Sequence, residues 1–278
     1  MNAIEKKGRN ELLLKGQEGG KGQNDPLLKV QGLTKNFGGV KAQDEVSFEV
    51  ETGGVMGLIG PNGAGKTTLF NMITGVYTPD RGDIVFNGQA ITTLPVHKRV
   101  ARGITRTFQN VALFAGMTVL ENVMVGMHVR LAGGFWSSVI RPPSFVRQEG
   151  ESREKALELL EFTGLADYAH RPAGDLPVGR QKMAEIARAL ASDPLLMLLD
   201  EPAAGLNRVE TSALGSLIDR IKERGTTLML VEHDMGLTME VSDKVLVLDQ
   251  GVVIALDTPR KIMNDPVVME AYLGVDSQ

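Results

Sequence analysis

Residues 60–67 read Gly60-Pro61-Asn62-Gly63-Ala64-Gly65-Lys66-Thr67 and fit the pattern G-x-x-x-x-G-K-[ST] at every fixed position. The apolar run at 55–59 predicts a short buried strand before this stretch, and residues 65–73 predict a helix after it. The glycines let successive backbone N–H groups face phosphates, and the helix N-terminus adds its positive dipole end. The alternative, a glycine turn with a chance lysine, explains neither flank. We therefore expect a phosphate-binding loop in which Lys66 reaches the β- and γ-phosphates and the Thr67 hydroxyl binds Mg²⁺.

A second apolar run ends in two carboxylates. Residues 195–199 predict another buried strand, and Asp200 and Glu201 follow it directly. Doubly wound folds bind ligands at the carboxyl edge of the sheet, which is where a Mg-nucleotide needs an acidic group. Asp200 is then placed for Mg²⁺, and Glu201, which points elsewhere, can act as general base on the attacking water. The alternative is that the two acids merely cap the next helix, but the phosphate loop favours the nucleotide site.

Strands and helices alternate outward from these two motifs. Order is expected from near Leu27, whereas the glycines and prolines of residues 125–150 break any regular period. The alternation predicts an α/β fold with a mostly parallel sheet covered on both faces. The hydrophobic patterns predict further strands at 46–50, 83–86, 104–108, 228–231, 245–248 and 252–255, and helices at 151–163, after Gly179 and at 214–221.

Composition excludes several functional classes. The net charge of −4 over 278 residues offers no basic surface for nucleic acid. The chain has no cysteine, which excludes disulfides, thiolate metal sites and cysteine nucleophiles. No segment approaches the ~18 apolar residues of a membrane helix, and the apolar run Leu12–Leu14 is too short for a signal peptide. We therefore expect a cytosolic chain that needs another subunit to reach across a membrane.

Four further motifs follow in a fixed order and narrow the class. They are Thr107-Phe108-Gln109-Asn110, Leu176-Pro177-Val178-Gly179-Arg180-Gln181, Ala204-Gly205-Leu206-Asn207 and Val231-Glu232-His233-Asp234. Together with the phosphate loop, they resemble the Q-loop, signature, D-loop and switch histidine of ABC ATPases from about Leu27 to Ala255. The resemblance implies a P-loop NTPase (RecA-like) core with an antiparallel β subdomain and an inserted helical subdomain.

The same resemblance suggests how the chain is divided. Residues 1–25 are polar and glycine-rich, so we expect a disordered tail. Residues 26–258 are expected to form the nucleotide-binding domain, with the helical subdomain at about 110–180. Residues 259–278 are expected to form a short C-terminal extension.

Two segments point to a subfamily. Asn122-Val123-Met124-Val125-Gly126 lies in a long stretch before the signature, and the chain ends with Glu270-Ala271-Tyr272-Leu273-Gly274. With the D-loop, these segments resemble the LivG-type cassette of branched-chain amino-acid importers. They are also similar to the cassettes of urea or amide importers and of lipopolysaccharide exporters, which remain alternatives.

The family resemblance assigns roles residue by residue. Glu201 activates water, His233 contacts the γ-phosphate and Gln109 completes the catalytic group. The Mg²⁺ ligands are Thr67, Gln109 and Asp200. The ATP-binding residues are Phe37, whose ring stacks on adenine, the signature residue Gly179, and the loop residues Gly60, Pro61, Asn62, Gly63, Ala64, Gly65, Lys66, Thr67 and Thr68.

The resemblance also implies partners. ATP and Mg²⁺ are the expected cofactors, with two ATP molecules held between this chain and a second, related but different cassette. Two transmembrane permease subunits would place the chain at the cytoplasmic face of a bacterial inner membrane, and an extracytoplasmic binding protein would deliver substrate. No nucleic-acid partner is expected.

The signature departs from the family pattern. Pro177 replaces the family's serine, Val178 its first glycine and Arg180 its glutamine, so that Gly179 alone remains of this core. In the family, the serine bonds the γ-phosphate held by the opposite subunit. Proline has neither a hydroxyl nor an N–H, whereas Val178 keeps its N–H and the helix keeps its dipole. We therefore expect a weakened ATP site, unless the remaining amides suffice.

Residues 125–150 combine apolar groups such as Trp136 with basic ones such as Arg141. An exposed Trp beside apolar neighbours is commoner at interfaces than on free surfaces, so this segment is predicted to face the membrane subunits. The alternative is a solvated loop over the helical subdomain.

Two rival functions stay open at this point. Soluble ABC ATPases that act on DNA or ribosomes usually carry two cassettes or a long coiled-coil insertion, and this chain has neither. A nucleotide-gated binding module with little turnover is compatible with the altered signature.

Overall fold

The computed structural model describes residues 25–107, 111–127 and 143–273, with the backbone alone at 143–149 and 273. The chain forms two compact units. Unit 1 consists of residues 1–99 and 218–278, and unit 2 consists of residues 100–217.

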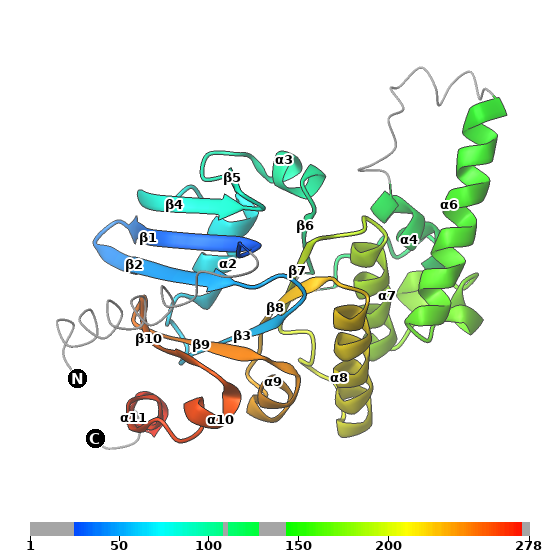
Figure 1. The fold of residues 1–278 in the computed structure, drawn as a ribbon. Coiled ribbons are helices and arrows are strands. Elements are labelled where there is room, and N and C mark those ends of the chain that lie inside the picture. Colours follow the sequence, from blue (N-terminus) through cyan, green and yellow to red (C-terminus); the bar gives the residue numbers. More distant parts are fainter. Residues whose placement is uncertain (1–24, 108–110, 128–142, 274–278) are drawn as a thin grey trace. The chain divides into compact units, whose positions relative to one another are not determined.

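Unit 1 contains an antiparallel sheet in the order β2-β1-β4-β5, in which β1, β2 and β4 lie side by side in Figure 1. The strands are β1 (Leu28–Phe37), β2 (Val40–Val50), β4 (Arg81–Phe86) and β5 (Gln89–Ala90). Val30 pairs with Phe48 on one side and with Ile84 on the other, and all three side chains are buried. The alternation that predicted a strand at 46–50 is therefore confirmed as part of the longer β2.

Unit 1 also holds the parallel strands that carry the phosphate loop. β3 (Val55–Ile59) lies between β8 (Thr227–Val231) and β9 (Lys244–Asp249), and β10 (Val252–Asp257) adds an antiparallel edge. Every residue of β3 and β8 is buried, as expected for parallel strands covered on both faces. At Gly57 a Cβ would lie 2.7 Å from Thr238 Cγ2, so α9 (Met235–Val241) packs directly on this strand.

Short helices complete unit 1. The loop helix α2 (Lys66–Thr74) follows β3, α3 (Val96–Ala101) spans the boundary with unit 2, and α10 (Pro259–Ile262) and α11 (Pro266–Leu273) end the described chain. The Arg99 side chain is fully buried and its guanidinium donates to Met72 O at 2.6 Å and Ile73 O at 2.8 Å. This cation therefore binds the last carbonyls of α2, where the helix dipole is negative. Burial lowers the pKa of Arg99 to about 10, which still leaves it charged at neutral pH.

Unit 2 pairs two strands with a group of helices. β6 (Ile104–Arg106) runs parallel to β7 (Leu196–Asp200), with Thr105 opposite Met197. The helices α4 (Val119–Met127), α6 (Pro143–Phe162) and α7 (Val178–Leu190) pack together, and α8 (Arg208–Glu223) leads from unit 2 into unit 1 (Figure 1). A Cβ at Gly126 would lie 2.1 Å from Arg188 O, so this glycine lets α4 approach α7 closely.

The helical predictions were partly wrong. Residues 125–150 were expected to lack regular structure and the next helix to start at 151, but α6 begins at Pro143. Proline suits the first helical position because its missing N–H would have no intrahelical partner there. The middle of the 125–150 segment, with Trp136 and Arg141, lies outside the described residues. Along the described chain, no helix is both long and apolar enough to cross a membrane.

Candidate nucleotide-binding site

The predicted phosphate loop connects β3 to α2 in unit 1. A Cβ at Gly60 would lie 2.1 Å from Leu248 O, so the loop can leave the sheet here only with glycine. Gly65 is the N-cap of α2 with a φ of +101°, and a Cβ there would lie 2.6 Å from the backbone oxygen of Ala42. Both glycines are thus required by close backbone contacts as well as by the turn itself.

The Lys66 side chain folds back over this loop. It is 7% exposed, and its ammonium donates to Gly60 O at 2.6 Å and to Pro61 O at 3.0 Å. Thr67 is exposed in the first turn of α2 and Thr68 is half-buried. Because glycine has no side chain to cap the helix, the first N–H groups of α2 remain suited to an anion. This combination of amides and a cation fits the β- and γ-phosphates of a nucleotide.

Gln43, on β2, supports the loop from outside and was not predicted. Its side chain is fully buried and Nε2 donates to Gly65 O at 2.8 Å. The turn between β9 and β10 adds a second support, since Gly251 N donates to Ala64 O at 3.1 Å. No sequence motif marks either residue, because their partners are backbone carbonyls brought close by the tertiary fold.

Phe37 and His233 also lie in unit 1. Phe37 ends β1 with 42% of its surface exposed, and its ring meets Tyr77 edge-to-face at 5.2 Å between centroids. A partly exposed ring of this kind can stack on a purine base. His233 is exposed just after β8, and its backbone N–H donates to Glu232 Oε2 at 3.1 Å.

In unit 2, the predicted metal ligand Asp200 is the last residue of β7 and is buried. Arg106 Nη2 lies 2.5 Å from Asp200 Oδ2, and the two side chains are only 8% and 7% exposed. The backbone N–H of Asp200 donates to the Thr107 hydroxyl at 3.3 Å. The end of β6 therefore holds this carboxylate in place. The sequence did not reveal Arg106 as its partner.

Glu201 follows Asp200 in an unusual backbone conformation. Its φ is +48°, in the left-handed region. Lys182 Nζ, from α7, donates to Glu201 O at 2.9 Å. The two neighbouring carboxylates therefore have different surroundings, one paired with a buried arginine and the other on a constrained turn.

The signature segment begins α7. Pro177 is the N-cap and Val178, the first helical residue, is 55% exposed. Gly179 is buried, and a Cβ there would lie 2.6 Å from Glu210 Oε1 on α8. This glycine thus leaves room for the Glu210 side chain of α8 beside the start of α7, inside unit 2. The predicted site residue Gln109 lies outside the described residues.

The donor types suit Mg²⁺. Magnesium in nucleotide sites usually takes one or two carboxylates, with phosphates and waters completing an octahedron. Asp200 supplies a carboxylate and Thr67 a hydroxyl. Among the described residues, no group of three or more histidine, cysteine or acidic side chains could hold a metal alone. A Mg²⁺ ion that arrives with the nucleotide phosphates fits this donor set.

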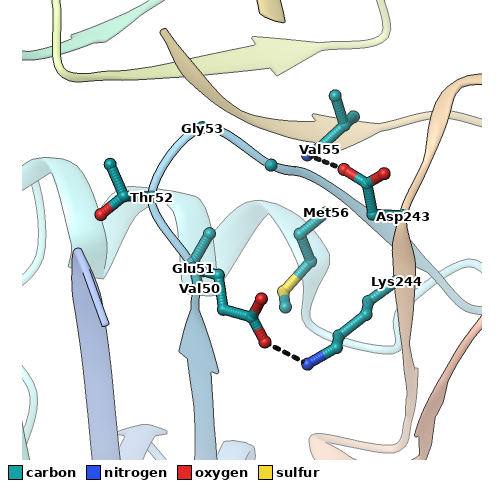
Figure 2. Close-up of a pocket in the computed structure, with 9 residues that line it drawn as sticks. Val50, Glu51, Thr52, Gly53, Val55, Met56, Asp243 and Lys244 are labelled. Atoms are coloured by element: carbon teal, nitrogen blue, oxygen red, sulfur yellow. Dashed lines mark hydrogen bonds and ion pairs between the residues drawn. The ribbon is translucent and has the colours of Figure 1, made fainter. Parts of the chain in front are cut away.

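A hollow of about 270 Å³ lies at the start of β3, where Figure 2 shows its lining. The charged groups there pair with one another. Lys244 Nζ meets Glu51 Oε1 at 2.5 Å, and Val55 N donates to Asp243 Oδ2 at 2.8 Å, both drawn in Figure 2. Asp243 also pairs with Lys222 at 2.6 Å. These pairs lie at the end of β3 that is opposite the phosphate loop.

A glycine loop between a buried strand and a helix, with its lysine folded over it, defines a P-loop nucleotide-binding protein. The ABC transporter family profile matches residues 43–204, and a profile for branched-chain amino acid ATP-binding cassette transporters matches residues 252–277. The chain therefore belongs to the ABC transporter family as an ATP-binding cassette, and it is an ATPase coupled to transport.

Individual relatives agree with this placement. The chain is 46% identical over 250 residues to the high-affinity branched-chain amino acid transport ATP-binding protein BraF of Pseudomonas aeruginosa, covering 90% of this chain and 98% of that one. It is 44% identical over 252 residues to LivG of Escherichia coli, with coverage of 90% and 99%. The crystal structure of the ADP conformation of MJ1267, an ATP-binding cassette of an ABC transporter, matches with a TM-score of 0.79 and 34% identity, covering 90% of this chain and 100% of that chain.

Proposed function

We propose that this chain is the ATP-hydrolysing subunit of an importer of branched-chain amino acids. The observation that carries the proposal is the second profile match, residues 252–277, which extends from β10 through α11. Relatives named for branched-chain amino acid transport are 44–46% identical, whereas a lipopolysaccharide export ATP-binding protein of Haemophilus influenzae is 35% identical. The amino-acid importer is therefore favoured over the exporter.

In this proposal, the phosphate loop binds ATP. The loop amides and the first turn of α2 receive the phosphates, while Lys66 exchanges its bonds to Gly60 O and Pro61 O for the β- and γ-phosphates. Phe37 stacks on the adenine. Thr67, Gln109 and Asp200 would hold Mg²⁺, which would supply positive charge beside the phosphates.

Glu201 serves as the general base. Its carboxylate accepts a proton from the attacking water while the water oxygen bonds to the γ-phosphorus and ADP leaves. His233 contacts the γ-phosphate. Gly179, at the start of α7, contributes helix N-terminal amides to ATP bound by a second cassette.

The proposed partners follow from the same family. They are a second, related cassette, two permease subunits and, on the far side of the membrane, a substrate-binding protein. The chain would then lie at the cytoplasmic face of a bacterial inner membrane through its contacts with the permeases. Residues 125–150 are proposed to face them.

Uptake by intact cells tests this function. Deletion of the gene should abolish high-affinity uptake of radiolabelled leucine, isoleucine and valine but spare urea uptake. Wild-type chain should restore it, and Lys66→Ala should not, because this variant removes the ammonium that would bind the phosphates. Normal leucine uptake in the deletion strain, or loss of urea uptake instead, would refute the proposed substrate class.

A further inference from the structure

The backbone at Glu201 is held in a conformation that its sequence does not favour. Its φ of +48° places a residue with a Cβ in the left-handed region. Pro202 follows, and the residue before a proline is normally extended. Residues persist in such conformations when surrounding contacts determine them, and such strain gathers at functional sites.

Two hydrogen bonds hold the Glu201 carbonyl. Ala204 N donates at 3.2 Å from within the same turn, which any chain in this turn could supply. The second donor comes from outside the turn, since Lys182 Nζ reaches Glu201 O at 2.9 Å from α7. Both residues belong to unit 2, and the Lys182 side chain is only 7% exposed.

A buried ammonium group is costly unless hydrogen-bonded acceptors replace its water. A methionine would fill a similar volume at this position without that cost. The lysine is therefore accounted for by what its charge does, and one contact of its ammonium is with the main chain of Glu201.

The carbonyl and the side chain of Glu201 are attached to the same Cα. When Lys182 fixes the direction of the carbonyl, it also limits rotation about φ and ψ and so sets where the Cα–Cβ bond points. Catalytic groups lose much of their effect when they are displaced by about 1 Å, with losses near 100-fold.

We propose that Lys182 is a positioning residue, which holds the Glu201 main chain in the left-handed conformation from which its carboxylate acts on the attacking water. The inference rests on the proposed role of Glu201 as the base. Lys182 would not itself contact ATP, so its replacement should change turnover rather than nucleotide binding.

The test measures ATP hydrolysis by the full chain within the assembled transporter, purified from the cells that produce it. Lys182→Met should lower kcat for ATP hydrolysis by about 10- to 100-fold, with KM for ATP within about threefold of wild type. Lys182→Arg, which keeps a cation, should recover most of the lost rate. Lys155→Met is the matched control, because Lys155 is a half-exposed lysine of unit 2 that pairs with Asp193, and it should leave kcat unchanged. If Lys182→Met does not fold, Lys182→Gln replaces it, since its shorter side chain cannot reach the same carbonyl.

Glu201→Gln separates this inference from the function on which it rests. In the Glu201→Gln chain the base is already lost, so adding Lys182→Met should change the residual rate by less than about threefold. An equal loss in both backgrounds would mean a merely structural role and would overturn the proposal. Wild-type turnover in Lys182→Met, with Glu201→Gln inactive, would also overturn it. Normal turnover in Glu201→Gln itself would instead remove Glu201 as the base.

Discussion

Arg106 and Asp200 form a buried ion pair at the end of the strand that carries the proposed metal ligand. Their side chains are 8% and 7% exposed. A pair this deep contributes little net stability compared with an apolar pair, but removing one partner leaves a buried charge uncompensated. The arginine thus allows an acidic group to remain buried at this end of the parallel strands.

Arg106→Met should therefore lower the free energy of unfolding by about 3–5 kcal/mol. The double variant Arg106→Met/Asp200→Leu should be more stable than the single variant, because no buried charge remains. Urea denaturation of the nucleotide-free chain at neutral pH measures both. A loss below about 1 kcal/mol in the single variant would contradict a structural role for the pair.

At the residue scale, the phosphate loop could be predicted from the sequence, because the geometry of the loop requires a particular residue type at each fixed position of its motif. Gln43, Arg106 and Lys182 were not predicted, because their partners lie far away in the sequence. Two of these three side chains bind backbone carbonyls, which any residue type can supply. No local pattern could reveal such contacts.

At the element scale, the buried parallel strands were the easiest to predict. Residues 55–59 match β3 at both ends, and the run predicted at 195–199 appears as β7 one residue later. The helix α4 was not predicted, because it contains Gly126, a poor helix former whose role is close approach to α7. Helices that depend on packing give weak signals in the sequence.

The start of α7 offers a test of the altered signature. Pro177 cannot donate to a phosphate, and Val178 exposes an apolar side chain where the family has glycine. Pro177→Ser/Val178→Gly should therefore raise hydrolysis at the ATP site whose phosphate loop belongs to the partner cassette. A hydrogen bond to a charged group is worth about 1.5–3 kcal/mol, or roughly 10- to 150-fold in rate if it forms fully in the transition state.

The rate should be measured in the assembled transporter, with the catalytic glutamate of the partner replaced in one series and that of this chain in another. Gly179→Ala is a control that should change the hydrolysis rate in the opposite direction. Its Cβ would lie 2.6 Å from Glu210 Oε1 and crowd the start of α7, so it should lower the rate. If the double variant assembles but hydrolyses ATP no faster, the Val178 and Gly179 amides already suffice.

At the scale of the whole chain, the C-terminal segment returns to the phosphate loop within unit 1. Val268 on α11 packs in a buried cluster that includes Ile59, the residue before Gly60. Tyr272 lies one turn further on the same side of the helix. Burial raises the pKa of Tyr272 to about 12, and the Gly60 backbone N–H beside the phenol acts in the opposite direction. The phenol is therefore neutral at any physiological pH, so this contact should not depend on pH.

Tyr272→Phe should weaken ATP binding while leaving the fold intact, because it removes the hydroxyl and keeps the ring. A neutral hydrogen bond contributes about 0.5–1.5 kcal/mol, and because Tyr272 is 37% exposed we expect a value in the lower half of this range for its contact with Gly60. A loss of about 0.5–1 kcal/mol would lower ATP affinity about two- to fivefold if the contact fixes the first residue of the loop. Calorimetric titration of the full chain with ATP measures this change. Tyr168→Phe is the control, since that ring contacts Arg171 and Arg180 in unit 2 and its loss of a hydroxyl should not alter affinity. Equal affinities for Tyr272→Phe and wild type would show that α11 supports the sheet but does not act on the loop.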